Sequence, residues 1–451
     1  MKRKIYDTLL DWKRKDAPRR ALLIDGARRV GKSWIVSEFA RREYETCLLI
    51  DFTKASRKVK ELFDDYLDDL DTFFSLLQTY ANVRLVPGKS VIVFDEVQNF
   101  PRAREAIKHL VADGRFHYIE TGSLISIRQN VKDILIPSEE IHVKMHPMDF
   151  EEFLWATGNE TRWDAVRDFF ARKKPLGRMA HKIMMDLFRQ YLVVGGMPQA
   201  VARHVETKGD FGEVDREKRH ILNLYRDGMQ KHAGALSYKV EAIFDSIPAE
   251  LSRHEKRFRP SDIGRETRMR DCEDAIFWLK DAMVVNACYN ATEPNIGLGL
   301  NADHATLKCY MLDTGLLVSH AFAENVLAAE EIHRRILFEK LEFNKGMIVE
   351  NAVAQMLVAA GRRLYFFSKY DKSNADDRME VDFLVAKSKL GRRKNVSPIE
   401  VKSSDNYATK SLDKFRAKYA QYVDTPYVLH AGDLKIADDV VYLPLYMAPL
   451  L

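Results

Sequence analysis

The sequence predicts a doubly wound α/β fold for residues 20–145, and three observations support this fold class. Short, almost purely apolar runs, typical of strands buried in a parallel sheet, occur at residues 21–25, 47–52 and 90–94. Residues 32–45 and 59–82 lie between these runs and have apolar side chains at helical spacing. A glycine-rich segment joins the first run to the first helical region. Alternation of this kind produces a parallel sheet with helices on both faces.

Changes in the apolar pattern divide the chain into four expected domains, residues 1–146, 147–240, 241–335 and 336–451. After residue 146 the strand signals fade and helical spacing dominates, which predicts a helical lid. The third domain begins with a helix, a turn at Pro260, a longer helix and a strand-like run, an order that resembles a winged helix-turn-helix.

The fourth domain combines helical and strand-like segments and is expected to be a mixed α/β module. Its expected helices lie at residues 345–360 and 410–421, and its expected strands at residues 363–367, 380–386, 397–402 and 427–430.

Composition excludes several classes of protein. With 451 residues, 46% hydrophobic and 30% charged, the chain can bury several cores and is not of the disordered type. Four scattered cysteines without CxxC spacing argue against a zinc site or a disulfide framework. We find no apolar stretch that is long enough for a membrane span or a signal peptide, so we expect a cytoplasmic protein. The net charge of +5 is too small to indicate a polyanionic partner by itself.

A nucleotide site is predicted by the segment that follows the first strand. It fits the P-loop pattern GxxxxGK[ST], and it lies between a strand and a helix as the mechanism requires. Its backbone N–H groups and the positive end of the following helix would bind phosphate oxygens. Lys32 would neutralise the β- and γ-phosphates, and Ser33 would hold magnesium. The predicted nucleotide-binding residues are Gly26, Ala27, Arg28, Arg29, Val30, Gly31, Lys32 and Ser33.

The second half of this site is predicted at the end of the strand at residues 90–94. Asp95 and Glu96 follow that strand at its carboxyl end, where ligands of parallel sheets bind. Asp95 suits the outer sphere of magnesium, and Glu96 suits the orientation of an attacking water. A further strand ends in residues 120–123, and Ser123, with Thr121 in reserve, is the candidate sensor of the γ-phosphate. The alternative is that these residues only form a turn after the strand.

Together these segments resemble prokaryotic AAA-type ATPases that are fused to a C-terminal domain of unknown function. The resemblance covers nearly the whole chain and rests on residues 26–33, 95–98, 121–123, 147–154 and 195–198. It implies that the nucleotide is ATP. Similar proteins often have a Gly-Arg pair before the fourth of these segments, but residues 135–140 contain no arginine. We therefore assign no arginine finger, and Arg128 is only a neighbouring candidate.

A second candidate site lies in the C-terminal module. Glu400 and Lys402 point to one face of a strand, because side chains alternate with period two, and Asp382 can meet them from the neighbouring strand. This set resembles restriction-endonuclease-like nucleases, in which an aspartate and an ExK pair bind magnesium. Glu350 stands in the right order to complete it. Glu350, Asp382 and Glu400 would hold Mg²⁺, and Lys402 would stabilise the anion at phosphorus.

Two hypotheses for the function follow. In the first, an ATPase couples ATP hydrolysis to DNA binding or processing, with ATP and Mg²⁺ as cofactors and DNA as partner. Seven basic residues between positions 253 and 270 would meet the DNA backbone. In the second, the protein is a nucleotide-dependent switch whose C-terminal module binds another protein and cuts nothing, since folds of this kind also persist as binding modules.

Overall fold

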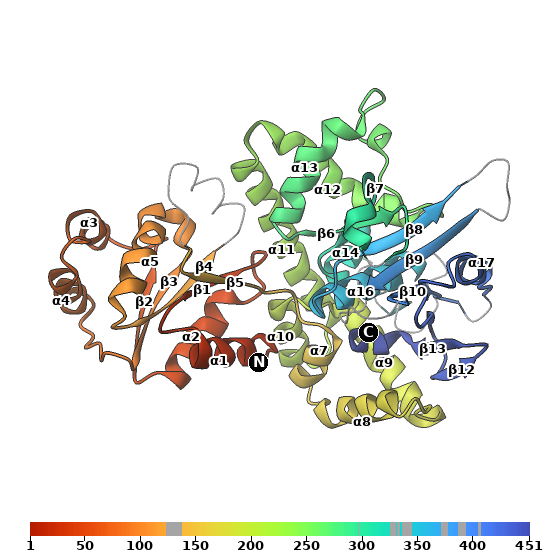
Figure 1. Cartoon of the computed structure of the whole chain (residues 1–451), viewed down its shortest axis with the longest axis horizontal. Helices are drawn as coiled ribbons and strands as arrows, with labels where there is room; N and C mark the ends of the chain where they lie inside the picture. The colour runs from red at the N-terminus through yellow and green to blue at the C-terminus, as the bar shows by residue number, and fades with distance from the viewer. Residues whose placement is uncertain are drawn as a thin grey trace. The chain divides into compact units, whose positions relative to one another are not determined.

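The structure is a computed structural model of the chain, and it describes residues 1–122, 138–295, 297–324, 331, 334–335, 345–370, 378–386, 394–404 and 407–451. These residues form two compact units, Met1–His146 and Pro147–Leu451. Figure 1 shows both units with their labelled elements. No helix within the described ranges is long and apolar enough to cross a membrane.

The first unit is built on a five-stranded parallel sheet with the order β2-β3-β4-β1-β5. Strand β4 therefore lies between β1, which precedes the glycine-rich loop, and β3, which ends in Asp95. The strands are β1 (Ala21–Asp25), β2 (Thr46–Asp51), β3 (Ser90–Asp95), β4 (His117–Gly122) and β5 (Glu140–Lys144). This parallel sheet confirms the α/β class predicted for the N-terminal part.

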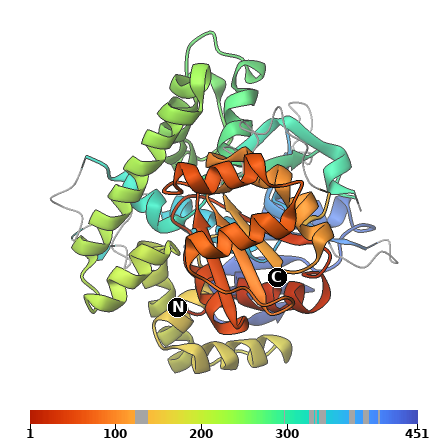
Figure 2. The same cartoon turned by 90° about the vertical axis from the view of Figure 1, so that its left-hand side faces the viewer.

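Helices cover both faces of this sheet, as Figures 1 and 2 show for the N-terminal unit. Leu23, Ile92 and Phe94 pack in one core with residues from α3, α4 and α5. The neighbouring strand residues point to the opposite face, where α2 contacts the sheet. The helices are α1 (Ile5–Lys15), α2 (Lys32–Glu43), α3 (Arg57–Asp65), α4 (Leu70–Ala81), the short 3₁₀ helix η1 (Val97–Asn99) and α5 (Pro101–Asp113).

The helical region expected at residues 59–82 is divided into two helices. Helix α3 ends at Asp65, and α4 begins at Leu70. Asp69 starts the second helix, because its carboxylate accepts hydrogen bonds from the Thr72 backbone N–H (3.2 Å) and from the Thr72 hydroxyl (2.6 Å). The apolar spacing continues across this interruption, which is why the periodicity alone did not reveal it.

The second unit begins with a series of helices. The first of them, α7, starts at a capping box in which Asp149 and Glu152 exchange hydrogen bonds between side chain and backbone. The helices are α7 (Phe150–Ala156), α8 (Glu160–Ala171), α9 (Arg178–Val194), α10 (Pro198–Glu206), α11 (Phe211–His232), α12 (Ser237–Ser252), α13 (Met269–Asp281), α14 (Thr314–Ala321), α16 (Lys345–Ala359) and α17 (Lys410–Lys418). Short 3₁₀ helices are η2 (Gly234–Leu236), η3 (Pro260–Asp262), η4 (Leu298–Asn301) and η7 (Leu445–Leu450).

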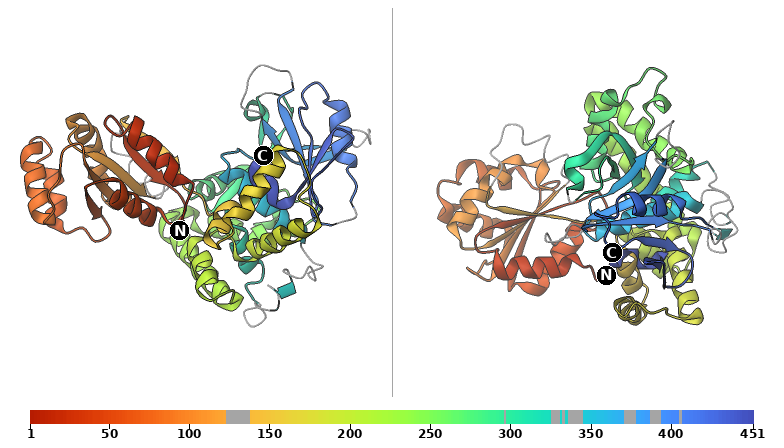
Figure 3. Two further views of the ribbon diagram at one scale, coloured as in Figure 1. Left: turned by 90° about the horizontal axis from the view of Figure 1, so that it is seen from below. Right: turned by 45° about the vertical axis from the view of Figure 1, so that its right-hand side comes forward.

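An eight-stranded mixed sheet organises the rest of this unit, with the order β12-β13-β11-β10-β9-β8-β6-β7. Figure 3 shows the blue C-terminal strands of this unit in two further views. Strands β6 and β7 form an antiparallel pair, and β6 also pairs in parallel with β8. The strands are β6 (Val285–Ala291), β7 (Ala302–Met311), β8 (Tyr365–Lys369), β9 (Met379–Ala386), β10 (Val396–Val401), β11 (Tyr427–His430), β12 (Lys435–Ala437) and β13 (Val440–Pro444).

The sheet thus contains strands from both sides of residue 335. The helix, turn, helix and strand-like run expected from the sequence correspond to α12, η3, α13 and β6, and β6 pairs with β7 in the same sheet as the C-terminal strands. The winged helix-turn-helix stays a prediction. The domain boundaries expected inside this unit stay predictions.

Candidate functional site

The glycine-rich loop connects the end of β1 to the start of α2. Gly31 has φ 96° and Arg29 has φ 68°, so the chain makes left-handed turns just before the helix begins. A side chain at Gly26 would place its Cβ atom 2.5 Å from the carbonyl oxygen of Met145, which the backbone does not permit. The two glycines of the pattern are therefore required by the shape of the loop.

The Lys32 side chain turns back into this loop. Its Nζ atom donates hydrogen bonds to the carbonyl oxygens of Gly26 (2.8 Å) and Ala27 (3.0 Å), and the residue is 6% exposed. Burial lowers the pKa of this amine, and the charges of Glu96, Asp25 and Asp95 only partly offset the effect. An anionic ligand in this loop would therefore stabilise the charged form of the Lys32 amine.

Asp95, at the carboxyl end of the sheet, accepts hydrogen bonds from two hydroxyl groups. Its Oδ1 atom accepts a hydrogen bond from the Ser33 hydroxyl (2.9 Å) and another from the Thr121 hydroxyl. Because β3 and β4 are parallel neighbours, with Phe94 opposite Glu120, the next residue of each strand reaches the same position. The structure thereby brings together residues from three elements, α2, β3 and β4.

Glu96 has a left-handed backbone conformation, with φ 53°, which residues other than glycine rarely adopt. Its backbone N–H donates to the Thr121 hydroxyl oxygen (3.3 Å), and the Gln98 side-chain amide donates to its Oε2 atom. Gln98 orients the carboxylate, a contribution that we did not predict from the sequence. The predicted sensor Ser123 and the neighbouring Arg128 lie outside the described residues, whereas Thr121, named in reserve, contacts Asp95 directly.

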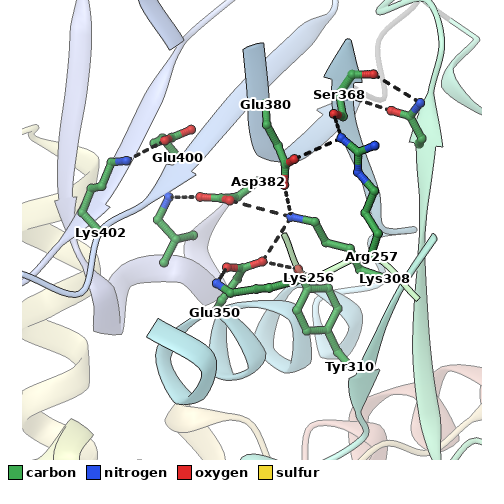
Figure 4. A network of polar contacts seen from close by, with 12 residues as sticks. Lys256, Arg257, Lys308, Tyr310, Glu350, Ser368, Glu380, Asp382, Glu400 and Lys402 are labelled. Carbon is green, nitrogen blue, oxygen red and sulfur yellow. Dashed lines mark hydrogen bonds and ion pairs between the residues drawn. The ribbon is translucent and has the colours of Figure 1, made fainter. Parts of the chain in front are cut away.

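The acids of the C-terminal module form a network with basic residues, which Figure 4 shows from close by. Glu350, on α16, accepts hydrogen bonds from the Tyr310 hydroxyl and from the Lys256 ammonium group. The Nζ atom of Lys308, on β7, lies 3.4 Å from Glu350 Oε1 and 2.9 Å from Glu380 Oε1. Glu350 is a predicted metal ligand and Lys256 was expected to meet a DNA backbone, whereas no role was predicted for Tyr310 or Lys308.

The remaining acids lie on the two neighbouring strands β9 and β10. Asp382 accepts a hydrogen bond from the backbone N–H of Val401 (2.8 Å), and its other oxygen lies 3.9 Å from Lys308 Nζ. Lys402 donates to Glu400 Oε1 (2.6 Å), so these two side chains share a face of the strand. The second carboxylate oxygen of Glu400 is buried and has no hydrogen-bond partner among the residues that the structure describes.

The charges of this network are unevenly balanced. Burial would raise the pKa of Glu350, but Lys256 and Lys308 lower it to about 2. Burial and the Glu350 charge raise the pKa of Asp382 to about 6, and burial and the Asp382 charge raise the pKa of Glu400 to about 8. The basic residues therefore compensate the Glu350 side of the network better than the Glu400 side.

The predicted magnesium ligands Glu350, Asp382 and Glu400 belong to one network, but a lysine lies among them. Lys308 contacts both Glu350 and Asp382. Among the residues that the structure describes, no group of three or more His, Cys, Asp and Glu side chains is arranged to hold a metal ion. The role of these three acids as metal ligands stays a prediction.

The basic segment that precedes α13 is divided between internal and exposed positions. Lys256 and Arg257 point into the acid network, where Arg257 lies 3.4 Å from Glu380. Arg265, Arg268 and Arg270 are exposed at the turn and at the start of α13. Arg259 is exposed as well, and its guanidinium lies 3.4 Å from the Glu255 carboxylate. Lys256 and Arg257 were predicted to meet a DNA backbone, but the structure places them in the acid network instead.

Comparison with known proteins agrees with the geometry of the N-terminal unit. Residues 18–154 match the family described as an AAA domain (AAA_14). The parallel sheet, the loop of residues 26–33 and this match define a P-loop ATPase domain of the AAA type. Residues 185–326 and 345–447 match two domains of unknown function, DUF8612 and DUF4143.

Three solved structures illustrate what the chain is similar to. The Walker-type ATPase PABY2304 of Pyrococcus abyssi has 16% identity and a TM-score of 0.41, with 71% of this chain and 95% of that chain covered. Cdc6p from Pyrobaculum aerophilum has 12% identity and a TM-score of 0.25, with 74% and 92% covered. PCH-2 of C. elegans has 9% identity and a TM-score of 0.22, with 45% and 57% covered. No curated protein matches the sequence.

Proposed function

We propose that the protein binds ATP in the loop of residues 26–33 and hydrolyses it. The observation that carries this proposal is the convergence of Lys32, Ser33, Asp95 and Thr121 at the carboxyl end of a parallel sheet, in a segment that matches an AAA domain. The Lys32 ammonium group would exchange the two loop carbonyls for phosphate oxygens, and Glu96 would orient the attacking water.

The oxygen atoms in this site fit a magnesium ion bound together with ATP. Mg²⁺ prefers oxygen ligands, and the Ser33 hydroxyl and the Asp95 carboxylate already lie 2.9 Å apart. These two residues would hold the ion, whose charge would counter that of the phosphates. Thr121 hydrogen-bonds both Asp95 and the backbone of Glu96, so it would couple the position of the ion to that of the water.

Steady-state hydrolysis and nucleotide titration test this proposal. Lys32→Ala should abolish hydrolysis and weaken ATP binding, because the phosphates lose their cation. Glu96→Gln should still bind ATP and hydrolyse it slowly, because only the orientation of water is impaired. Lys54→Ala, an exposed lysine of the same unit, is the matched control and should behave as wild type. Unchanged turnover in Lys32→Ala would end the ATPase proposal.

We further propose that the second unit binds DNA. The supporting observation is the exposed group Arg265, Arg268 and Arg270, which lies at the turn of a helix, turn, helix and ribbon arrangement. Stimulation of ATP hydrolysis by single-stranded, duplex or branched DNA tests the coupling of the two units. The alternative, a nucleotide-dependent switch that binds a protein, predicts no response to any DNA.

We propose that this DNA binding occurs without cutting. Support comes from the acid network, where lysines already contact the carboxylates that a nuclease would need for its metal ion. Each DNA form should therefore stay intact in Mg²⁺ or Mn²⁺. Cutting that is lost in Asp382→Ala, and kept in the exposed control Asp413→Ala, would support the nuclease hypothesis instead.

A further inference from the structure

We propose that the Lys308 ammonium group is a built-in counter-ion, which takes the place of a divalent cation among the acids of the C-terminal module. The site would accept a hard divalent cation, such as Mn²⁺, only when this amine is removed. The inference deepens the non-cutting function proposed above for the C-terminal module, and it does not depend on the ATPase.

The contacts of Lys308 resemble those of a small cation rather than those of a surface lysine. Its Nζ atom lies within 4 Å of three carboxylates, at 2.9 Å from Glu380, 3.4 Å from Glu350 and 3.9 Å from Asp382. One of these carboxylates would be enough to neutralise a lysine in a single ion pair. Three acids around one ammonium group supply oxygen atoms of the kind that a hard divalent cation prefers.

Burial makes these contacts obligatory. The Lys308 side chain is 1% exposed, and an ammonium group in such a place is tolerated only when it is paired. Its ammonium group also lies over the Phe366 ring, with Nζ 5.0 Å from the ring centroid. Lys308 therefore cannot leave the acids for solvent while the sheet remains intact.

The acids come from parts of the chain that only the fold brings together. Glu350 lies on α16, Glu380 and Asp382 lie on β9, and Lys308 lies on β7 (Figure 4). Without a cation, three carboxylates would repel one another at the junction of these elements. Lys256 contacts Glu350 and Arg257 contacts Glu380, whereas Lys308 is a positive charge that lies within 4 Å of all three acids.

A second observation indicates that the network has capacity for a further positive charge. Glu400 is 6% exposed, yet within the described part of the chain its Oε2 atom has no hydrogen-bond partner. It lies on β10 beside the β9 strand that carries Asp382. A metal ion that replaced the Lys308 amine would gain hard oxygen ligands from Asp382 and Glu380. The Glu400 side chain lies on the next strand, β10, beside them.

Thermal unfolding of the whole chain without nucleotide tests the inference, in a chelator and in millimolar Mn²⁺. The wild-type melting temperature should be the same in both, because the cation is built in. Lys308→Met keeps the length and apolar packing but removes the charge, so in chelator its melting temperature should fall by roughly 5–15 °C. Mn²⁺ should recover a large part of that loss, and a Mn²⁺ titration should detect one new site.

A matched control is available in Lys218, which is also fully buried. Its ammonium group donates to the Val193 carbonyl (2.8 Å) and lies 4.0 Å from one carboxylate, that of Asp215. Lys218→Met should lower the melting temperature as well, but Mn²⁺ should not restore it. Equal recovery in both variants would overturn the inference, as would a wild-type protein that binds Mn²⁺ as tightly as Lys308→Met.

A double variant keeps the test decisive if Lys308→Met alone does not fold. Lys308→Met with Glu380→Gln removes one negative charge together with the positive one, so it should be more stable in chelator than the single variant and less responsive to Mn²⁺. A double variant that is no more stable than the single one would contradict the counter-ion role. Cutting of DNA by the wild type would instead end the non-cutting proposal, which these stability measurements do not address.

Discussion

Gly196→Ala is expected to be among the most damaging single substitutions in the second unit. A Cβ atom at this position would lie 1.9 Å from the carbonyl oxygen of Met148 and 2.8 Å from its nitrogen, and real Cβ contacts essentially never fall below 3.0 Å. The two backbones must therefore separate by about 1 Å. Two hydrogen bonds oppose this, from Met148 N to Gly196 O (2.7 Å) and from Gly196 N to the buried carboxylate of Asp313 (2.5 Å).

The expected cost follows from these two terms. Forced overpacking costs about 1–3 kcal/mol, and losing a hydrogen bond to a charged group costs about 1.5–3 kcal/mol, so the free energy of unfolding should fall by about 2.5–6 kcal/mol. Urea unfolding followed by tryptophan fluorescence measures the change. Gly346→Ala is the control, because its Cβ would lie 3.7 Å from the nearest atom and a helix favours alanine. A loss under about 1 kcal/mol in Gly196→Ala would refute the steric argument.

Three further predictions concern the two sites. Thr121→Val should bind ATP normally but lower kcat on the order of 10- to 100-fold, since the hydroxyl that joins Asp95 to Glu96 is lost; an unchanged single-turnover rate would contradict its role. Replacing Arg265 and Arg268 by Ala should reduce the slope of log DNA affinity against log salt by about one to two, and an unchanged slope would place the contact elsewhere. Burial and the Asp382 charge raise the pKa of Glu400 to about 8 in the folded protein, so between pH 4.5 and about 8 this side chain is ionised in the unfolded chain and protonated in the folded one. The free energy of unfolding should therefore fall as pH rises through this range, and Glu400→Gln should flatten the dependence. A wild-type curve without such a fall would show that Glu400 is ionised in the folded state.

The nucleotide site could be predicted because its chemistry is local. Residues 26–33 are contiguous, and the loop needs its glycines for shape and its lysine for charge. The contact between Asp95 and Thr121 required one further step, that parallel neighbouring strands end at the same edge of the sheet. What the sequence could not supply was the orientation of Glu96 by Gln98, because a turn of two residues has no periodic signal.

The C-terminal network could be predicted only in part. The alternation of Glu400 and Lys402 on one strand is local, and the order of the strands placed Asp382 beside them. The partners of Glu350 lie 42 and 94 residues away along the chain, where spacing carries no information. A signal for Lys308 nevertheless exists: it interrupts the apolar run at residues 307–311, and a charge inside a buried strand must find a partner.

The same network explains why the ribbon and the C-terminal module form one sheet. Lys308 lies on β7 and Lys256 lies between α12 and η3, yet both contact the Glu350 carboxylate on α16. Separating the helix-turn-helix segment from the module would leave buried charges without partners, and breaking one such pair costs about 3–5 kcal/mol. A ligand can drive that separation only if its affinities for the two states differ by as much. Arg265 and Arg268, which precede α13, and Arg270, in its first turn, should therefore move together with the acid network as one body.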